Sequence, residues 1–256
     1  MAKVFKKIKE YFSEWNWFEL TFIIVFELAF IVLGIVLKQS FFSCLYSIAI
    51  LLGAFFLAKG KWYAYIFCIL GILNYVYLSF TEMYYAEAVW HLCFTVPMYV
   101  VSMIQWFKHQ QGKEVKIRRI TKLETILFIL GVIILCVLIW LVLTLIEAPQ
   151  ALTSALAVTF SAMANYLAMR RSDWSFVAYC FDDVFVIVLW LIPVIQGETA
   201  VFNVMLTMFA FLINDTYGLI NWSRIKRKQS MLDSEKAEVS KSQLEQPSET
   251  QQIKND

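Results

Sequence analysis

Two adjacent aspartates, Asp182 and Asp183, mark the position in this chain where chemistry is most strongly indicated. They lie near the middle of an apolar stretch over residues 174–196, which is long enough to cross a bilayer as a helix. An ionisable side chain at that depth is costly and by default indicates function. Adjacent helical positions are about 100° apart. We therefore expect one carboxyl group to face a central cavity and the other to be protonated or bonded to a neighbouring helix.

Asp183 is the better candidate for a ligand-facing carboxylate. Its approximate helical neighbours include Tyr179 and Trp190, so it belongs to a stripe with two aromatic rings. Asp182 shares its face with a more uniformly apolar stripe, which suits packing. For either residue the alternative is a carboxyl group that packs against Ser, Thr or Asn of another helix.

Amides and indole rings supply further candidate contacts. Asn74, Asn165 and Asn214 lie within apolar stretches, where the alternative for each amide is a hydrogen bond that holds two helices together. Trp90 and Trp190 lie inward of the ends of their stretches, where a ring can stack on a planar molecule and attract a cation. Aromatic faces and a carboxylate favour a planar cation, and the amides add hydrogen-bonding groups.

Three other polar residues are weaker candidates. Asn203 lies close to the outer end of its stretch, and Asp215 lies near an inner end, where it can meet Arg or Lys. His91 is a lone histidine, which suits packing better than proton transfer.

The chain lacks the usual signatures of metal, nucleotide and hydrolytic sites. Its five cysteines all lie in apolar stretches without CxxC spacing, so we expect neither disulfides nor a metal site. No GxxxxGK[ST], GxSxG or HExxH pattern occurs, which argues against ATP hydrolysis and against an enzyme. We predict no cofactor, no metal, no catalytic residue and no nucleic-acid partner.

Eight apolar stretches must position these residues, and together they predict an all-α integral membrane protein. Hydrophobic residues make up 60% of the 256-residue chain. Helices satisfy every backbone group in lipid. The predicted spans are residues 18–37, 41–58, 62–80, 84–107, 125–146, 150–169, 174–196 and 200–222.

Basic residues cluster at alternate joints between these spans. The clusters precede the first span and follow the second, fourth, sixth and eighth, around Lys7, Lys59, Lys116, Arg170 and Lys226. Under the positive-inside rule, eight spans place every cluster on the cytoplasmic side together with both termini, whereas seven do not. The sequence thus predicts a multi-pass protein of the cell membrane, embedded in the lipid bilayer.

Other segments follow from composition and from a weak internal repeat. Residues 1–17 form a basic amphipathic segment and 18–37 an extra helix. Residues 41–107 and 150–222 are three-helix units that begin outside and end inside, separated by a basic cytoplasmic loop at 108–124 and a linker helix at 125–146. Residues 230–256 lack aromatic residues and predict a disordered cytoplasmic tail.

Two details of sequence support the repeat. The connection after the first helix of each unit has a similar sequence. Leu57-Ala58 is followed by a basic turn and Trp62, and Leu167-Ala168 is followed by two arginines and Trp174. Both units end in an amide followed by tryptophan, in Gln105-Trp106 and Asn221-Trp222. Such a parallel repeat places a substrate site near the midplane between the halves.

This 3+1+3 plan with an extra N-terminal helix resembles the PnuC family of bacterial nicotinamide riboside transporters, whose core is SWEET-like. The resemblance covers about residues 41–225 and is carried by Trp174, by Phe181-Asp182-Asp183-Val184 and by Tyr217-Gly218-Leu219-Ile220-Asn221-Trp222. Pro97-Met98-Tyr99 and Gln105-Trp106 match in the first half, although Val100-Val101-Ser102 replaces an expected glycine. The resemblance implies facilitated diffusion driven by cytoplasmic phosphorylation of the substrate, and a homotrimer.

The sequence therefore predicts a transporter of nicotinamide riboside. The predicted substrate-binding residues are Asp183, Asp182, Trp190, Asn165, Asn214, Asn74, Trp90 and Tyr179. Transport of another vitamin, such as thiamine or riboflavin, is the alternative. A polytopic membrane enzyme or a sensor is a further one, although a retinal-type sensor needs a lysine inside a late span and spans six to eight contain none.

Overall fold

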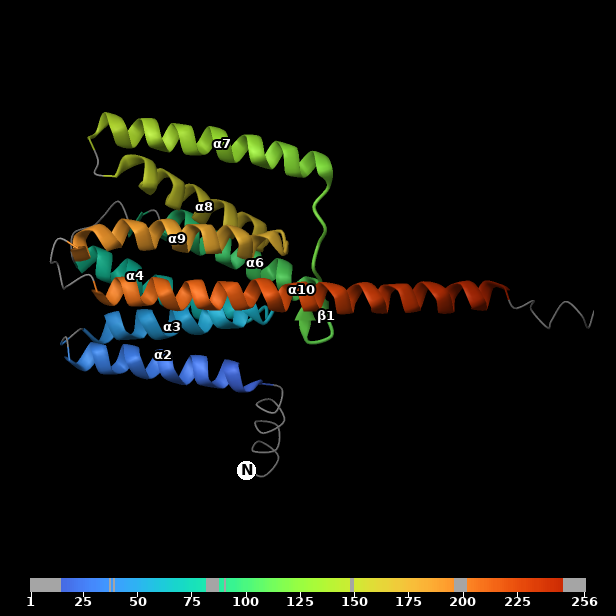
Figure 1. Ribbon diagram of the computed structural model, residues 1–256. Coiled ribbons are helices and arrows are strands. Elements are labelled where there is room, and N and C mark those ends of the chain that lie inside the picture. The colour runs from blue at the N-terminus through green and yellow to red at the C-terminus, as the bar shows by residue number, and fades with distance from the viewer. Residues whose placement is uncertain are drawn as a thin grey trace, which may run out of the picture.

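Helices make up most of the described chain and lie side by side in a bundle (Figure 1). A computed structural model describes residues 15–36, 38, 40–81, 88–89, 91–147, 150–195 and 202–245. The predicted amphipathic segment before Trp15, Trp90 and the last residues of the predicted tail lie outside these ranges. The prediction of an all-α chain is confirmed, apart from one short hairpin.

The helical elements follow the chain with short connections. They are α2 (Trp17–Val36), α3 (Phe41–Ala58), α4 (Ala64–Thr81), the π-helical turn η1 (His91–Thr95), α6 (Val96–Lys108), α7 (Lys122–Leu145), α8 (Ala151–Met169), α9 (Trp174–Ile195) and α10 (Phe202–Glu245). The hairpin joins β1 (Gln110–Gln111) to β2 (Glu114–Val115), with Gln110 opposite Val115.

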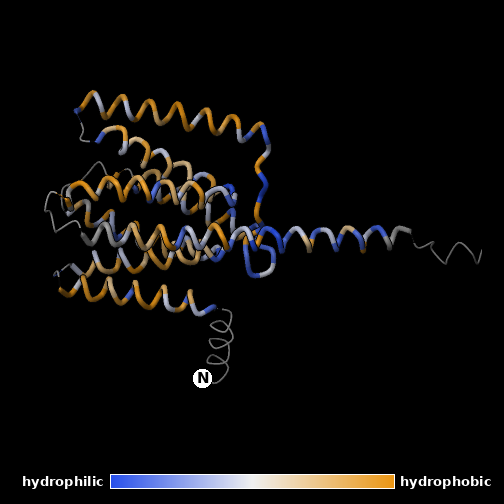
Figure 2. The backbone as a smooth tube through the Cα atoms, viewed as in Figure 1, coloured by the Kyte–Doolittle hydropathy of each residue, from blue (hydrophilic) through white to orange (hydrophobic). Residues whose placement is uncertain are grey.

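Apolar residues predominate along the helices of the bundle, whereas the hairpin and the end of α10 are mainly polar (Figure 2). Four helices, α2, α3, α7 and α8, are long and apolar enough to cross a membrane, and α4 contains a shorter apolar segment. None of the residues of α7 is fully buried: a stripe that includes Phe128 is half-buried against α8, and the remaining apolar surface of the helix is exposed. A helix of that kind needs lipid or another protein around it.

The packing order places six helices around a common centre. α3 packs on α4 and α10, α9 packs on α8 and α10, and α6 packs on α4 and α8. α2 lies against α3 at one edge of the bundle, and α7 lies against α8 at the other (Figure 1). Bulky aromatic side chains fill the core, with Tyr65, Trp106, Phe176 and Trp222 each at most 2% exposed.

The helix predicted over residues 84–107 differs from the structure. Ala88 and Val89 are α-helical, but residues His91–Thr95 form a π-helical turn, and the α-helix α6 begins at Val96. Pro97 stands at the start of α6. Its ring nitrogen cannot donate to the preceding turn, so the α-helical hydrogen-bond ladder cannot run unbroken through this position.

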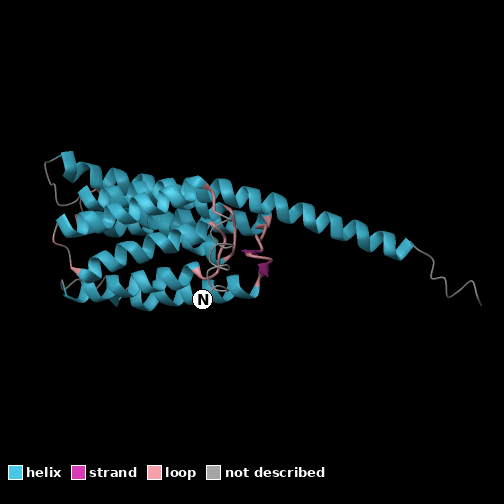
Figure 3. Cartoon of the chain, turned by 90° about the horizontal axis from the view of Figure 1, so that it is seen from below, coloured by secondary structure: helices cyan, strands magenta, loops and turns pink. Residues whose placement is uncertain are grey.

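The prediction of a disordered tail from residue 230 is wrong as far as Glu245. α10 continues as one helix beyond the bundle (Figure 3). Residues 230–245 are rich in Ser, Glu and Lys, contain neither Gly nor Pro, and extend a helix that is already nucleated. Its residues after Gln229 are exposed where their side chains are described, so the expectation that they bury no core is compatible with the structure.

The turn between α3 and α4 has the same hydrogen bonds as the turn between α8 and α9. Gly60 and Arg171 both have positive φ, at 68° and 60°. Each turn contains three backbone hydrogen bonds with the same spacing. In the first turn, the amides of Lys59, Gly60 and Lys61 donate to the carbonyls of Phe55, Leu57 and Phe56, respectively. In the second turn, the amides of Arg170, Arg171 and Ser172 donate to the carbonyls of Tyr166, Ala168 and Leu167. By this equivalence Leu57 corresponds to Ala168, whereas the sequence pattern aligned Leu57 with Leu167.

The connector between α6 and α7 binds both turns. The Val115 amide donates to the Gly60 carbonyl at 2.9 Å, and the Arg118 amide donates to the Arg171 carbonyl at 3.0 Å. Gln229 of α10 holds the same connector, because its side chain accepts from the Ile117 amide at 3.0 Å and donates to the Val115 carbonyl at 2.9 Å. We call this end of the bundle, with the two turns, the hairpin and the exit of α10, the basic end.

Two tryptophans bond across the bundle at the basic end. The Trp106 indole of α6 donates to the carbonyl of Ala168 at the end of α8, at 2.7 Å. The Trp222 indole of α10 donates to the carbonyl of Leu57 at the end of α3, at 3.1 Å. The two rings are in contact, with centroids 5.3 Å apart.

An ion pair ties each outer helix to the helix that follows it. Glu19, in the first turn of α2, pairs with Lys59 at 2.7 Å, and Glu124, in the first turn of α7, pairs with Arg170 at 2.5 Å. The backbone amide of each glutamate also donates to a capping side chain three residues earlier, which fixes the start of the helix.

Candidate substrate cavity

A small cavity lies where the six central helices meet. Its volume is about 150 Å³. It is lined by Ile50, Ala54 and Leu57 of α3, Cys68 of α4, Tyr99 of α6, Ser161 and Asn165 of α8, Phe176, Tyr179, Asp182 and Asp183 of α9, and Phe211 and Asp215 of α10. Small-molecule sites typically measure about 300–1,000 Å³. A nucleoside can therefore enter only if this cavity widens.

Three carboxyl groups line this cavity. Asp183 is 5% exposed and Asp215 is 7% exposed. The Asn214 amide donates to Asp215 Oδ1 at 2.9 Å, whereas Asp183 Oδ2 has no hydrogen-bond partner. Within the described part of the chain, none of the three aspartates forms an ion pair. The cavity is therefore an acidic site without a cation of its own.

Amide and phenol groups form a second side of the cavity. The Tyr179 hydroxyl donates to Asn165 Oδ1 at 3.0 Å, and Asn165 Nδ2 donates to the Ser161 carbonyl at 2.9 Å. These bonds fix the orientation of the Asn165 amide. Phe176 closes the cavity towards the basic end, because its ring packs on Trp222 with centroids 5.2 Å apart.

The structure brings together most of the residues predicted from the sequence. Asp182, Asp183, Asn165 and Tyr179 line the cavity, and Asn214 is buried beside it through its bond to Asp215.

The other predicted contacts are not placed at the cavity. Asn74 is buried on α4, where its amide donates to the Leu70 carbonyl of its own helix at 2.7 Å. Trp190 belongs to α9, but its side chain is outside the described set, as is the whole of Trp90.

Sequence reasoning missed Asp215, Tyr99 and Ser161 as cavity residues. Asp215 was expected to meet a cation near an inner helix end, yet it faces the cavity with the other two aspartates. One signal was available, since Asn214-Asp215 is a polar pair inside an apolar span and resembles Asp182-Asp183 in that respect. The sequence offered no comparable signal for Tyr99, because its residue type is common throughout the chain.

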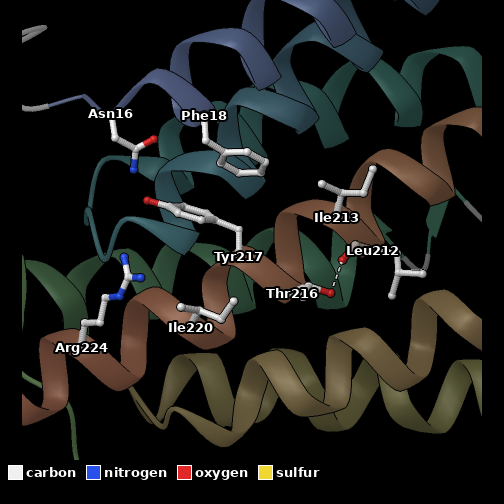
Figure 4. A pocket seen from close by; sticks show the side chains of 8 residues that line it. All are labelled: Asn16, Phe18, Leu212, Ile213, Thr216, Tyr217, Ile220 and Arg224. Carbon is white, nitrogen blue, oxygen red and sulfur yellow. Dashed lines mark hydrogen bonds between the residues drawn. The ribbon is translucent and has the colours of Figure 1, made fainter.

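A larger groove lies between α2 and α10 (Figure 4). Its volume is about 680 Å³, and it is lined by Asn16, Phe18, Leu212, Ile213, Thr216, Tyr217, Ile220 and Arg224. The Phe18 and Tyr217 rings pack together with centroids 5.5 Å apart. Among these described lining residues, Arg224 is the one with a charge, and none is a carboxylate. Because the groove is mainly apolar and its described lining lacks an acidic group, it is a poorer site for a cation than the central cavity.

Comparisons with known proteins agree with this geometry. Residues 40–224 match the family described as nicotinamide mononucleotide transporter. A relative from Neisseria mucosa, the nicotinamide riboside transporter PnuC, is 25% identical over 235 residues, which cover 87% of this chain and 87% of the relative. The crystal structure of the vitamin B3 transporter PnuC superposes with a TM-score of 0.71 at 23% identity, over 86% of this chain and 96% of that one.

Proposed function

This chain belongs to the nicotinamide mononucleotide transporter family, and from that premise we propose that it carries nicotinamide riboside across the cell membrane. The relative from Neisseria mucosa transports this compound by name. The observation that carries the proposal is the buried acidic cavity at the centre of the bundle.

The cavity chemistry suits this substrate. Nicotinamide riboside is a flat pyridinium cation joined to a sugar, so a carboxylate can balance its charge and aromatic rings can stack on its face. Asp183 offers an unpartnered carboxyl oxygen, and Tyr179 and Phe176 offer ring surface. Asn165 offers an oriented amide to the sugar hydroxyls or the carboxamide. Thiamine is also a cation and remains the alternative substrate, whereas neutral riboflavin leaves the carboxylates unpaired.

Transport by this chain is facilitated diffusion, with direction supplied by phosphorylation of the substrate in the cytoplasm. The family resemblance supports this mechanism and a homotrimeric assembly. A transporter of this kind performs no chemistry on its substrate, in keeping with a family of transporters rather than enzymes.

The proposed topology has eight spans and both termini in the cytoplasm. Lys59, Lys61, Arg170 and Arg171 all lie on turns at the basic end, where α10 also leaves the bundle. The positive-inside rule makes this end cytoplasmic.

A topology of this kind is tested by labelling single cysteines placed at Gln111 or Ser240 with a membrane-impermeant reagent. Label should enter only after the cells are permeabilised. Labelling of either position in intact cells would show that the basic end faces outward.

The proposed architecture is a 3+1+3 parallel repeat with an extra N-terminal helix. The matching turns and the crossed tryptophan bonds support it, because each indole bond joins the third helix of one unit to the first helix of the other. The helices that precede the two units also correspond to each other. Glu19 of α2 pairs with Lys59 at the end of α3, and Glu124 of α7 pairs in the same way with Arg170 at the end of α8.

Uptake of labelled nicotinamide riboside tests the proposed function. Cells that produce the chain should accumulate the label, and unlabelled nicotinamide riboside should compete better than thiamine or riboflavin. Asp183→Asn should reduce binding of the cation at least tenfold, because one charge interaction disappears while the side chain keeps its shape, a change of about 1.4 kcal/mol or more. Asp233→Asn is the matched control, since Asp233 is exposed beyond the bundle. Equal affinity of wild type and Asp183→Asn would remove Asp183 from the site.

A further inference from the structure

We infer that a cationic substrate entering the central cavity displaces a proton that Asp183 and Asp215 share. This inference rests on the proposed function and adds to it a change in protonation during binding. The bond that breaks is a carboxyl O–H bond, and the proton passes to bulk solvent. The carboxylate that remains pairs with the incoming cation, so one positive charge replaces another in the cavity.

The first step of the argument is the excess of acidic groups over cations. Asp182, Asp183 and Asp215 border one cavity of about 150 Å³ without an ion pair within the described part of the chain. Isolated carboxylates in such surroundings are strongly disfavoured, and several in one small space also repel each other. At least one of them therefore carries a proton when the cavity is empty.

Neighbouring titratable groups in the described helices supply no compensating charge. They are Tyr46 of α3, Tyr65 and Cys68 of α4, Tyr99 of α6, and Tyr179 and Cys180 of α9. Phenols and thiols are neutral in their protonated forms, which prevail near neutral pH. From α8 the cavity receives the uncharged Ser161 and Asn165. The counter-charge of an ionised aspartate must therefore come from a ligand.

The second step is the proximity of Asp183 and Asp215. Both carboxyl groups line the same cavity of about 150 Å³, so each lies in the electrostatic field of the other. Two ionised carboxylates only accept hydrogen bonds and repel each other, so this proximity is favourable only with a proton on one of them. The Asn214 amide donates to Asp215 Oδ1 and thus stabilises negative charge on Asp215. The shared proton is therefore held between a hydrogen-bonded Asp215 and a largely buried Asp183.

The third step is the unpartnered oxygen. Asp183 Oδ2 is buried at the cavity and has no hydrogen-bond partner, although an unsatisfied buried oxygen is costly. A pyridinium ring has no N–H group to donate to this oxygen, so it stabilises the oxygen through its positive charge. It can do so only if Asp183 is ionised, so the cation and the proton compete for the same carboxyl groups.

Competition of this kind has a defined dependence on pH. Where the pair holds its proton in the empty cavity, each cation that binds releases about one proton, and its affinity falls about tenfold for each unit of decrease in pH. A neutral ligand of the same shape releases none. The reduced form of nicotinamide riboside, whose dihydropyridine ring is uncharged, is such a ligand.

The experiment is titration calorimetry of the purified full-length chain in two buffers of different ionisation enthalpy, phosphate and Tris. The observed heat of nicotinamide riboside binding should differ between the buffers by an amount that corresponds to release of about one proton. The heat of binding of the dihydro form should not differ. Asp215→Asn should bind the cation with much reduced proton release, and Asp233→Asn should behave as wild type.

The outcomes separate this inference from the proposed function. Binding of nicotinamide riboside by the wild type with a heat that is independent of buffer, and with an affinity that is independent of pH between 5 and about 8, would overturn the shared proton and leave the function intact. Absence of binding by either ligand would contradict the proposed function itself. Because the wild-type measurement decides the question alone, failure of the Asp215→Asn variant to fold does not affect the test.

Discussion

Two glutamates on α2 have opposite environments. The Glu19 carboxylate pairs with Lys59 at 2.7 Å and accepts a hydrogen bond from the Tyr217 hydroxyl. Lys59 also lies over the Trp15 ring, 4.7 Å from its centroid. Glu27, two turns further along, has both carboxyl oxygens buried without a hydrogen-bond partner. One glutamate is therefore part of a satisfied cluster and the other is not.

Substitution of these glutamates should change stability in opposite directions. Glu27→Met should raise the midpoint of thermal unfolding, because it removes an unsatisfied polar group from an apolar span. Glu19→Met should lower it, since loss of one partner of a buried ion pair costs about 3–5 kcal/mol. Tryptophan fluorescence of the purified protein during heating measures both. A lower midpoint for Glu27→Met would indicate that this carboxyl has a partner in the assembled protein.

At the scale of elements, the turn between α3 and α4 is most favourable with glycine at position 60, although Arg171 adopts a similar φ in the matching turn. Gly60 has a φ of 68°, and a Cβ atom there would lie 3.4 Å from Ile225 Cδ1. Gly60→Ala should therefore destabilise the chain by about 1 kcal/mol. Gly131→Ala is the matched control, because a Cβ atom at Gly131, inside α7, would meet no described atom within 4 Å, and alanine favours a helix. Thermal unfolding compares the two, and an equal loss would contradict the role of the turn.

Sequence patterns predicted the helices well and their interruptions poorly. Apolar length is enough to recognise α2, α3, α7 and α8, whose ends lie within a few residues of the predicted spans. The π-helical turn before Pro97 was missed because hydropathy does not register a change of hydrogen-bond pattern. The helical tail was missed because a polar composition without aromatic residues was equated with disorder, although the segment continues a helix that is already formed.

The candidate site was predictable in part. Carboxyl and amide groups inside apolar spans identified Asp182, Asp183 and Asn165, since such groups are costly unless they serve a purpose. The sequence did not reveal that Asp215 joins them from another helix, because that proximity depends on how α9 and α10 cross. It also did not distinguish Asn74, whose bond stays within α4.

At the scale of the whole molecule, α10 serves as both a bundle helix and a brace. Gln229 binds the connector between the halves through Ile117 and Val115. Deletion of residues 230–256 should leave uptake largely intact, because this deletion retains Gln229 and removes exposed helix. Deletion that begins one residue earlier, at Gln229, should reduce thermal stability, since two buried backbone groups of the connector lose their partner. Uptake and unfolding of both truncated chains, at matched membrane abundance, measure the difference.

The crossed tryptophan bonds mean that neither half of this molecule is chemically complete by itself. The acceptor of the Trp106 indole belongs to α8, and the acceptor of the Trp222 indole belongs to α3. A fragment that contained one half would bury an indole N–H without an acceptor, whereas two such fragments related by a two-fold axis would each supply the acceptor that the other lacks. These two bonds thus exchange acceptors between the segments before and after α7, as the contacts between two subunits of a symmetric dimer do.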